Sequence, residues 1–526
     1  MTLLQIRDLA VSYRTRSGLV RAVDGIDLDI EPGETIALVG ESGSGKSTTA
    51  HAVIGLLGGD GRVERGSVTF EGQDLTKLSE RELRTVRGAR IGLIPQDPTV
   101  SLNPVKRIGE QVAEVLRLHG LASRRSAGLG AVELLDRAGL PEPAMRARQY
   151  PHELSGGMRQ RALIAVAIAA RPALLIADEP TSALDVTMQR LILDYLQRLS
   201  EEQGTAVLLV THDLGVAADR AQRIAVMSHG RIVEVGQTVA ILDAPTHAYT
   251  QHLLASVPSR VASPAPVRDD PLVVVEGVSK DFKSVRAVDD VSFSVHRHET
   301  FALVGESGSG KTTTARMVLR QLDPSTGSIS FDGEDITRAR GRALRSLRRR
   351  AQLIYQNPYA SLDPRFSIAE VIGEPLRAFG VGNAASRLAR ARDLLDQVRL
   401  PSSTLRRRPA ELSGGQRQRV AIARALALSP ELVVCDEPVS ALDVSVQAQV
   451  LQLLTELQAE TGVAYLFISH DLGVVRQIAH RVAVMHRGRI VETGPTDALF
   501  AAPTHAYTQE LLRAIPGAEL GGRSAR

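Results

Sequence analysis

The sequence feature that most constrains the fold is a phosphate-binding pattern that occurs twice, once in each half of the chain. Residues 40–47 read GESGSGKS and residues 305–312 read GESGSGKT, and both fit G-x-x-x-x-G-K-[ST]. The glycines let backbone N–H groups curl into an anion cradle, and the helix that follows presents its positive N-terminus to the phosphates. One match would also suit a glycine-rich turn before a helix. Two matches, each after a β-branched strand, predict two nucleotide sites.

A tandem duplication extends this repeat over the whole chain. Lys46 and Lys311 are 265 residues apart, and Gln96 and Gln356 are 260 residues apart. Three further pairs are each 258 residues apart: Ser155 and Ser413, Asp178 and Asp436, and His212 and His470. Residues 259–271 contain three prolines and predict a semi-extended linker that reaches roughly 40 Å. We therefore predict two domains, residues 1–258 and 272–526. Because the linker keeps them at high effective concentration, we expect them to pair with each other.

Each half is predicted to have an α/β fold. Residues 35–39, 173–177 and 206–210 are apolar runs without alternation, as expected for a parallel sheet that is covered on both faces. Residues 100–170 have Leu and Ala at helical spacing. We expect an α/β core with a helical insertion, preceded by a small β region.

Composition and charge disfavour nucleic-acid binding. Aromatic residues make up 3% and tryptophan is absent, which disfavours a stacking platform for single-stranded nucleic acid. The pI is near 9.3, but the net charge is only +4. The basic residues are nearly all arginine, which reflects either a coding bias or nucleic-acid binding; we favour the bias because acidic residues are interspersed.

Cysteine content and hydropathy predict a cytoplasmic protein. The single cysteine, Cys435, excludes a disulfide framework and a Cys-based metal cluster within the chain, and it lies in an apolar run typical of a buried residue. Residues 1–8 lack the basic and apolar segments of a signal peptide. The most apolar stretch, residues 162–170, is too short to span a membrane.

Paired acids end an apolar strand in each half. Asp178-Glu179 and Asp436-Glu437 follow such runs. A lone acidic pair could simply increase solubility, but after a phosphate loop the Asp suits Mg²⁺ and the Glu is placed to orient or deprotonate a water molecule. The hydroxyl that closes each phosphate loop, on Ser47 or Thr312, also suits Mg²⁺.

The most diagnostic segments are LSGGMRQR at residues 154–161 and LSGGQRQR at residues 412–419. Their serines suit a helix N-cap, and their glycines allow close approach to an anion. A capped helix start would explain either copy alone. Together with the phosphate loops, the two segments resemble the signature of the ATP-binding cassette (ABC) family, and the resemblance covers essentially the whole chain.

This resemblance implies two tandem cassettes, each with a RecA-like parallel-sheet core, an antiparallel β region and a helical subdomain. It also implies two sites for ATP and Mg²⁺, each formed by the phosphate loop of one cassette and the signature of the other. One site would join Gly40, Ser42, Gly43, Gly45, Lys46, Ser47, Thr48, Gln96, Asp178, Glu179 and His212 to Ser413, Gly414 and Gly415. The other would join Gly305, Ser307, Gly308, Gly310, Lys311, Thr312, Thr313, Gln356, Asp436, Glu437 and His470 to Ser155, Gly156 and Gly157.

Several of these roles come from the resemblance alone. Gln96 and Gln356 match the Q-loop glutamine that touches Mg²⁺, and His212 and His470 match the switch histidine, although either could be an ordinary strand-end histidine. Residues 182–185 and 440–443 match the D-loop. Tyr13 and Phe282 lie where the family stacks an aromatic ring on adenine, and an ordinary core or surface aromatic is the alternative for each. Met158 departs from the family signature, which has glutamine at this position, as the second copy does at Gln416. We therefore expect a modest asymmetry between the two ATP sites.

Further segments narrow the subfamily: SLNP at 101–104, SLDP at 361–364, HDLGV at 212–216 and 470–474, and THAYT at 246–250 and 504–508. They resemble the dipeptide/oligopeptide/nickel importer family, in a version with two fused ATPase subunits. The resemblance implies ATP hydrolysis that energises import at the cytoplasmic face of the membrane. The implied partners are two transmembrane permease subunits and an extracytoplasmic substrate-binding protein. We expect no nucleic acid, and no iron–sulfur cluster after the closing segments, because cysteine is absent there.

Di- and oligopeptides are the first candidate substrates, and nickel chelates, glutathione and oligosaccharides are alternatives. A soluble double-cassette ATPase of the ribosome is the alternative from another class, but it would join its cassettes by a long charged helix. A DNA-repair ATPase would carry a large coiled-coil or zinc insertion. The arginine run at residues 338–350 suits a solvated helix, with a membrane or RNA surface as the alternative.

Overall fold

The computed structural model describes residues 2–15, 18–181, 184–255, 270–283, 285–357, 361–440 and 442–517. The chain divides into two compact units: Met1–Val257 together with Pro516–Arg526 form the first, and Pro258–Ile515 form the second. The predicted linker, residues 259–271, lies outside the described residues except for its last two, and a strand already begins at Pro271.

A six-stranded sheet forms the centre of the first unit, in the order β10-β9-β3-β8-β7-β6. Its strands are β3 (Thr35–Val39), β6 (Ile91–Ile94), β7 (Leu174–Asp178), β8 (Ala206–Thr211), β9 (Arg223–Ser228) and β10 (Arg231–Gln237). All neighbours pair in parallel except β10, which is antiparallel to β9. Every residue of β3, β7 and β8 is buried, because helices cover both faces of the sheet, and this explains their unbroken apolar sequences.

Helices follow the central strands of this unit. They are α1 (Lys46–Val53), α8 (Val186–Gln203), α9 (Leu214–Arg220), α10 (Thr238–Asp243) and α11 (Ala248–Ala255). Since α1 starts directly after the loop at the carboxyl end of β3, its positive end lies where an anion binds in parallel α/β sheets.

An antiparallel sheet of order β2-β1-β4-β5 packs on this core. It consists of β1 (Leu4–Thr15), β2 (Gly18–Ile30), β4 (Gly61–Phe70) and β5 (Gln73–Asp74), followed by η1 (Leu75–Lys77) and α2 (Glu80–Val86). It is the small β region expected at the start of the chain.

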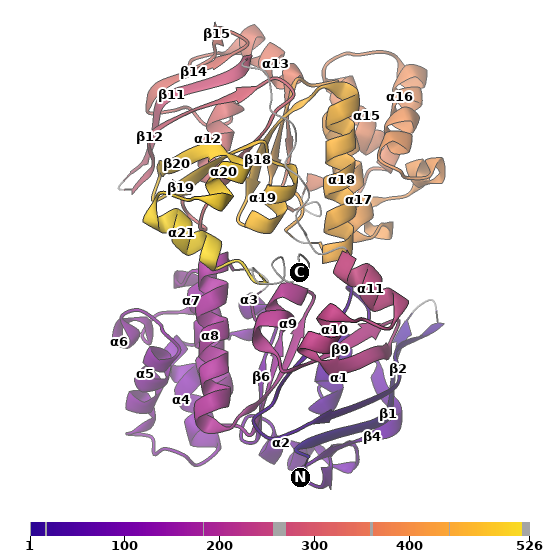
Figure 1. The fold of residues 1–526 in the computed structure, drawn as a ribbon, viewed down its shortest axis with the longest axis vertical. Coiled ribbons are helices and arrows are strands. Elements are labelled where there is room, and N and C mark those ends of the chain that lie inside the picture. Colours follow the sequence, from indigo (N-terminus) through magenta and orange to yellow (C-terminus); the bar gives the residue numbers. More distant parts are fainter. Residues whose placement is uncertain are drawn as a thin grey trace. The chain divides into compact units, whose positions relative to one another are not determined.

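A helical subdomain is inserted between β6 and β7. It contains α3 (Pro98–Ser101), α4 (Ile108–Leu118), α5 (Ala127–Arg137), α6 (Pro143–Arg146), η2 (Pro151–Glu153) and α7 (Gly156–Ile168). Its helices share an apolar cluster of their own, and they form a group beside the sheet in Figure 1. The helical insertion predicted at residues 100–170 is therefore present.

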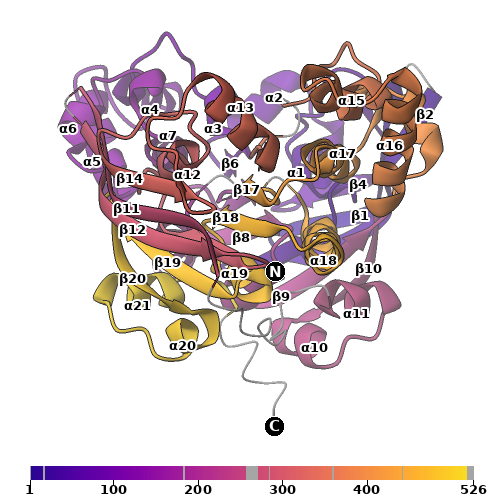
Figure 2. The same cartoon turned by 90° about the horizontal axis from the view of Figure 1, so that it is seen from above.

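The second unit repeats this architecture. Its six-stranded sheet has the matching order β16-β17-β18-β13-β19-β20, and its antiparallel sheet has the order β12-β11-β14-β15. The strands are β11 (Pro271–Phe282), β12 (Val285–His296), β13 (Thr300–Val304), β14 (Thr326–Phe331), β15 (Glu334–Asp335), β16 (Ala351–Ile354), β17 (Leu432–Asp436), β18 (Ala464–Ser469), β19 (Arg481–His486) and β20 (Arg489–Pro495). Figure 2 shows β11, β12 and β14 stacked together at one flank of this unit. The predicted fold is confirmed: each of the two units has an α/β core with a mainly parallel sheet, an antiparallel β region and a helical insertion.

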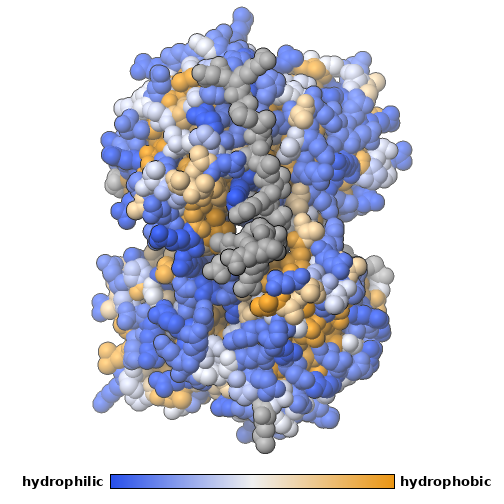
Figure 3. Space-filling view, in the orientation of Figure 1, coloured by the Kyte–Doolittle hydropathy of each residue, from blue (hydrophilic) through white to orange (hydrophobic). Residues whose placement is uncertain are grey.

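The helices of the second unit correspond to those of the first. They are α12 (Lys311–Val318), α13 (Gly341–Arg350), α15 (Ile368–Ala378), α16 (Ala384–Gln397), η3 (Ser402–Arg406), η4 (Pro409–Glu411), α17 (Gly414–Leu426), α18 (Val444–Thr461), α19 (Leu472–Ile478), α20 (Thr496–Ala501) and α21 (Ala506–Arg513). Among the described residues, no helix combines the length and apolar character that crossing a membrane requires. On the visible face of each unit, hydrophilic residues predominate and hydrophobic ones form smaller patches (Figure 3).

Candidate functional site

The phosphate loops have a backbone shape that requires glycine. Gly40 has φ of +152°, and a Cβ atom there would lie 2.1 Å from the carbonyl oxygen of Met227 at the end of β9. A Cβ atom at Gly305 would lie at the same 2.1 Å from the carbonyl oxygen of Met485. Both loops are thus pressed against the neighbouring strand, and a side chain at either position would displace the backbone.

Each loop curls around its own lysine. Lys46 Nζ donates to the carbonyl oxygens of Gly40 at 2.7 Å and Glu41 at 2.8 Å. Lys311 Nζ makes the corresponding bonds to Gly305 and Glu306, both at 2.7 Å. These contacts hold a full positive charge against the backbone of the loop.

The cradle fits a polyphosphate. A Cβ atom at Gly43 or Gly308 would meet nothing within 4 Å, so there is open space next to the loop backbone. The Ser44 hydroxyl is buried and has no hydrogen-bond partner among the described residues. A buried hydroxyl without a partner carries a free-energy cost, which an anion accepted at the cradle would relieve.

A hydroxyl and a carboxylate meet beside each loop. Ser47 Oγ donates to Asp178 Oδ1 at 3.0 Å, and Thr312 Oγ1 donates to Asp436 Oδ1 at 3.0 Å. Burial raises the pKa of Asp178 and Asp436, against the opposing effect of the hydroxyl hydrogen bonds. A divalent cation would favour the charged form of these carboxylates, and their oxygens are ligands that suit Mg²⁺.

A glutamate bound by a histidine and a glutamine lies next to each of these carboxylates. His212 Nδ1 is 3.0 Å from Glu179 Oε1, and Gln96 Nε2 donates to Glu179 Oε2 at 2.7 Å. The second unit repeats the arrangement, with His470 at 3.0 Å from Glu437 and Gln356 at 2.8 Å. The geometry joins the switch histidine and the Q-loop glutamine through one carboxylate.

These contacts set the charge of the glutamate. Burial opposes ionisation of Glu179, but the hydrogen bond and positive charge of His212 outweigh it and lower the pKa of Glu179. Burial likewise opposes protonation of His212, and its bond to Glu179 outweighs that and raises the pKa of His212. Glu437 and His470 shift in the same directions for the same reasons. An ionised glutamate is the form that can accept a proton from water.

The backbone at both glutamates is strained, which the sequence did not indicate. Glu179 has φ of 46° and Glu437 has φ of 48°, in the left-handed region that favours glycine. Their N–H groups donate to the neighbouring strand, at Val210 and Ile468. A non-glycine residue in this conformation costs about 1–3 kcal/mol and is typical of functional positions.

The signature segments start the helices α7 and α17. Ser155 and Ser413 are exposed N-caps that accept a bond from the N–H three residues on. Gln416 returns a bond to the Ser413 N–H at 3.1 Å and completes a capping box, which Met158 cannot do. Gly415 is crowded, because a Cβ there would lie 2.5 Å from Val446, whereas a Cβ at its counterpart Gly157 would have its nearest neighbour, Met188, at 3.3 Å.

Within each unit, hydrogen bonds join the loop hydroxyl to the first acid of the pair, and the second acid to the glutamine and the histidine, as one predicted site requires. Ser155 and its glycines lie on the helical subdomain and make no hydrogen bond to that cluster among the described residues. Ser42 and Ser307 lie exposed in the phosphate loops, and Thr48 and Thr313 are half-buried in the first turn of the following helix.

The remaining predicted residues have mixed surroundings. Tyr13 is half-buried and packs against the core of the first unit, whereas Phe282 is 44% exposed with Lys280 5.4 Å from its ring centre. Of the D-loop residues, Ser182, Ala183 and Ala441 lie outside the described residues. Asp185 and Asp443 cap α8 and α18.

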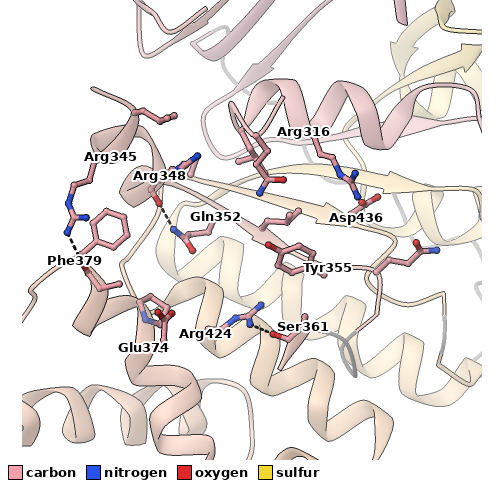
Figure 4. Close-up of a pocket in the computed structure, with 18 of the residues that line it drawn as sticks. Arg316, Arg345, Arg348, Gln352, Tyr355, Ser361, Glu374, Phe379, Arg424 and Asp436 are labelled. Carbon is pink, nitrogen blue, oxygen red and sulfur yellow. Dashed lines mark hydrogen bonds between the residues drawn. The ribbon is translucent and has the colours of Figure 1, made fainter. Parts of the chain in front are cut away.

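The second unit also has a cleft of about 1150 Å³ between α12, α13, β16 and α15. Thr312, Gln356 and Asp436 of the predicted nucleotide site lie along it. Its other charged side chains are Arg316, Arg345, Arg348, Arg424 and Glu374, so positive charge predominates (Figure 4). Arg345 donates to the Ala378 carbonyl and lies over the ring of Phe379.

The arginine run therefore divides between two roles. Arg350 pairs with Asp332 and Glu431 at the edge of the sheets. Arg345 and Arg348 line the cleft, and neither has an ion-pair partner in the described part of the chain. In α2, the helix at the same place in the first unit, Glu80 instead pairs with Arg84 and Arg87.

Two family models match the chain. The model described as "ABC transporter" matches residues 23–182 and 288–440, which include both phosphate loops and both paired acids. The model described as "Oligopeptide/dipeptide transporter, C-terminal region" matches residues 233–269 and 491–524, which include both closing segments. Both halves therefore carry the same pair of matches.

Relatives match almost the whole chain. The glutathione import ATP-binding proteins GsiA of Salmonella typhimurium (strain LT2) and Escherichia coli O157:H7 are each 44% identical over 559 residues, which cover 98% of this chain and 90% of theirs. Among solved structures, the ATP-binding cassette MJ0796, a dimer in a post-hydrolysis state bound to ADP and Pi, is 31% identical with a TM-score of 0.42, covering 45% of this chain and 98% of its own. The family predicted from the sequence is confirmed. The chain therefore belongs to the ABC transporter family, as an ATP-binding subunit with two fused cassettes whose ATPase activity is coupled to transport.

Proposed function

We propose that the chain energises the import of short peptides, with glutathione as the first substrate to test. The observation that carries this proposal is the 44% identity with glutathione import proteins over 98% of the chain. The two oligopeptide/dipeptide C-terminal regions agree with it, since glutathione is itself a tripeptide. Nickel chelates and oligosaccharides are the remaining candidates from the sequence.

The proposed ATP sites are composite. Lys46 and the loop N–H groups would bind the phosphates, and the Ser47 hydroxyl and Asp178 would hold Mg²⁺, which neutralises phosphate charge when bound. Glu179 would orient and deprotonate the attacking water, while His212 and Gln96 keep its carboxylate in place. Ser413 of the other cassette would complete this site, and Ser155 would complete the site built on Lys311. The equivalence of the two halves in contacts and distances supports two competent sites.

The proposed partners are two transmembrane permease subunits at the cytoplasmic face of the membrane, served by an extracytoplasmic substrate-binding protein. The cleft of the second unit supports docking of a permease loop or helix, because Gln356 and Thr312 lie in it and would sense an occupant directly. Arg345 and Arg348 give the cleft an excess of positive charge, so we propose that an acidic loop or helix of a permease binds in it.

Charge reversal tests this docking. With permeases coexpressed, Arg348→Glu should weaken co-purification roughly tenfold, because it places like charges together. Arg84→Glu on α2 is the control, since Arg84 already pairs with Glu80. Equal retention of permeases by the Arg348→Glu chain and the unmodified chain would refute an acidic occupant.

Reconstitution tests the function itself. In proteoliposomes that contain the chain, its two permeases and the binding protein, we expect glutathione to stimulate ATP hydrolysis and to accumulate in the lumen. Stimulation by a nickel chelate or an oligosaccharide instead would replace the peptide assignment. Co-purification with ribosomes in place of permeases would overturn the importer.

A further inference from the structure

We infer that Tyr249 and Tyr507 are positioning residues of the nucleotide sites, through which the C-terminal region of each cassette holds its phosphate loop. The N–H of Glu41, the second residue of the first loop, donates to the Tyr249 hydroxyl at 3.1 Å. The N–H of Glu306 donates to the Tyr507 hydroxyl, also at 3.1 Å. The two units form the same bond between residues that are 208 and 201 positions apart.

The bond acts on a residue that the loop lysine already holds. The carbonyl oxygen of Glu41 accepts from Lys46 Nζ, so Tyr249 and Lys46 fix the two ends of one residue. Gly40 just before it is pressed against the carbonyl of Met227, and Gly43, two residues after it, faces open space. Tyr249 thus binds the loop between Gly40, which is packed against β9, and the open phosphate-binding cradle. Its hydroxyl would fix the orientation of the loop backbone that forms the cradle.

A carboxylate anchors the helix that carries each tyrosine. Glu234 of β10 accepts bonds from the N–H and hydroxyl of Thr246, at 2.8 Å each, and from the N–H of His247 at 3.1 Å. These residues directly precede α11. Burial opposes the charge of Glu234, but the bonds from Thr246 and His247 outweigh it and lower the pKa to about 2. The carboxylate is therefore ionised at neutral pH and ties α11 to β10.

Glu492 anchors α21 by the same contacts. It accepts from the N–H of Thr504 at 2.7 Å, from the Thr504 hydroxyl at 2.8 Å and from the N–H of His505 at 3.1 Å. β10 and β20 pair with the strands whose carbonyls pack against Gly40 and Gly305. In each unit the anchored strand, the helix after it and its tyrosine therefore form a brace that contacts the phosphate loop from two sides. The anchors and the tyrosines all lie in the segments that match the oligopeptide/dipeptide C-terminal region.

The rings are held independently of their hydroxyls. Tyr507 stacks on His486, with ring centres 4.0 Å apart and planes inclined by 13°. Tyr249 packs against an apolar cluster that includes Val39, the last residue before Gly40. Replacing either tyrosine with phenylalanine keeps this packing and removes only the bond to the loop.

The test is nucleotide affinity of the full chain without permeases, which keeps it separate from the substrate and import proposals. For Tyr249→Phe combined with Tyr507→Phe, we expect the Kd for MgADP and the KM for ATP to rise roughly threefold to tenfold, as the loss of one hydrogen bond per site predicts. We expect kcat to change less than twofold, because the bond shapes the loop equally in the ground and transition states.

Tyr465→Phe is the matched control. Its hydroxyl donates to the Leu454 carbonyl at 3.1 Å inside the core of the second unit, so the variant also loses a buried tyrosine bond, away from the loop. Tyr465→Phe should lower the melting temperature and leave Kd and KM unchanged. Unchanged nucleotide affinity in the double variant, or an equal rise in the Tyr465→Phe chain, would overturn the inference.

Discussion

At the scale of single residues, the proposed chemistry centres on Glu179 and Glu437, each of which combines a strained backbone, a lowered pKa and two side-chain partners. Glu179→Gln and Glu437→Gln should each lower the ATPase turnover of the affected site at saturating ATP by about 10² or more, because the general base of that site is lost. The exposed Glu202→Gln serves as the control. Near-normal turnover in either variant would contradict two equally competent sites.

Cys435 is a residue whose behaviour follows from burial alone. Its side chain has no exposed surface in β17, and burial raises the pKa of the thiol. The thiolate is the reactive form, so the native chain should react with a thiol reagent only as fast as it unfolds. Labelling should become fast in 6 M guanidinium chloride, whereas rapid labelling of the native chain would contradict the buried position.

Residue types with local motifs were predictable, and residue contacts were not. The phosphate loops, the paired acids and the signature serines are short patterns whose chemistry is contained in their own spacing. The bond from Gln96 to Glu179 is different: the family resemblance implied a contact between Gln96 and Mg²⁺, and the protein partner of Gln96 depends on how the chain leaves β6. The positive φ of Glu179 also depends on tertiary packing, because no local residue pattern indicates it.

At the scale of helices, both signature helices have a serine N-cap, but only α17 has the second hydrogen bond, from the Ser413 N–H to the Gln416 side chain, that completes a capping box. Gln416→Met should remove the returned bond to Ser413 and lower the free energy of unfolding by about 0.3–1.5 kcal/mol. Met158→Gln should restore a box at α7 but lose the packing of Met158 on the helical subdomain, so its net effect should be smaller. Denaturation of both variants checks this; equal changes at the two positions would show that the cap is not the cause.

The anchors of α11 and α21 should respond to acid. The pKa of Glu234 and Glu492 is lowered to about 2, so their stabilisation is complete above the ordinary value near 4.5 and is lost as the pH falls towards 2. Hydrogen exchange of residues 246–255 and 504–513, corrected for intrinsic rates, should accelerate between pH 5 and 3. In a Glu234→Gln chain, residues 246–255 should lose this pH dependence while residues 504–513 keep it.

Helices and strands were predictable as far as their periodicity is local. The strands at residues 35–39, 173–177 and 206–210 follow from unbroken apolar runs, and the helical insertion follows from its spacing. The brace between α11 and the phosphate loop was not predictable, because it joins residues 208 positions apart. The THAYT repeat signalled that these segments matter but not what they contact.

At the scale of the whole molecule, the proposed ATP sites differ from independent ones in which signature completes which phosphate loop. In the proposed composite arrangement, Lys46 and Ser413 would belong to one site, and Lys311 and Ser155 would belong to the other. A chain that carries two substitutions in the same site should lose only that site and keep the other. A chain that carries one substitution in each site should lose both.

The most direct test counts the ATP molecules trapped per chain on a Glu179→Gln, Glu437→Gln background, which slows hydrolysis. Lys46→Ala combined with Ser413→Arg should still trap one ATP per chain, and Lys46→Ala combined with Ser155→Arg should trap none. The opposite pattern, none with Ser413→Arg and one with Ser155→Arg, would mean that each cassette completes its own site and would contradict the composite architecture.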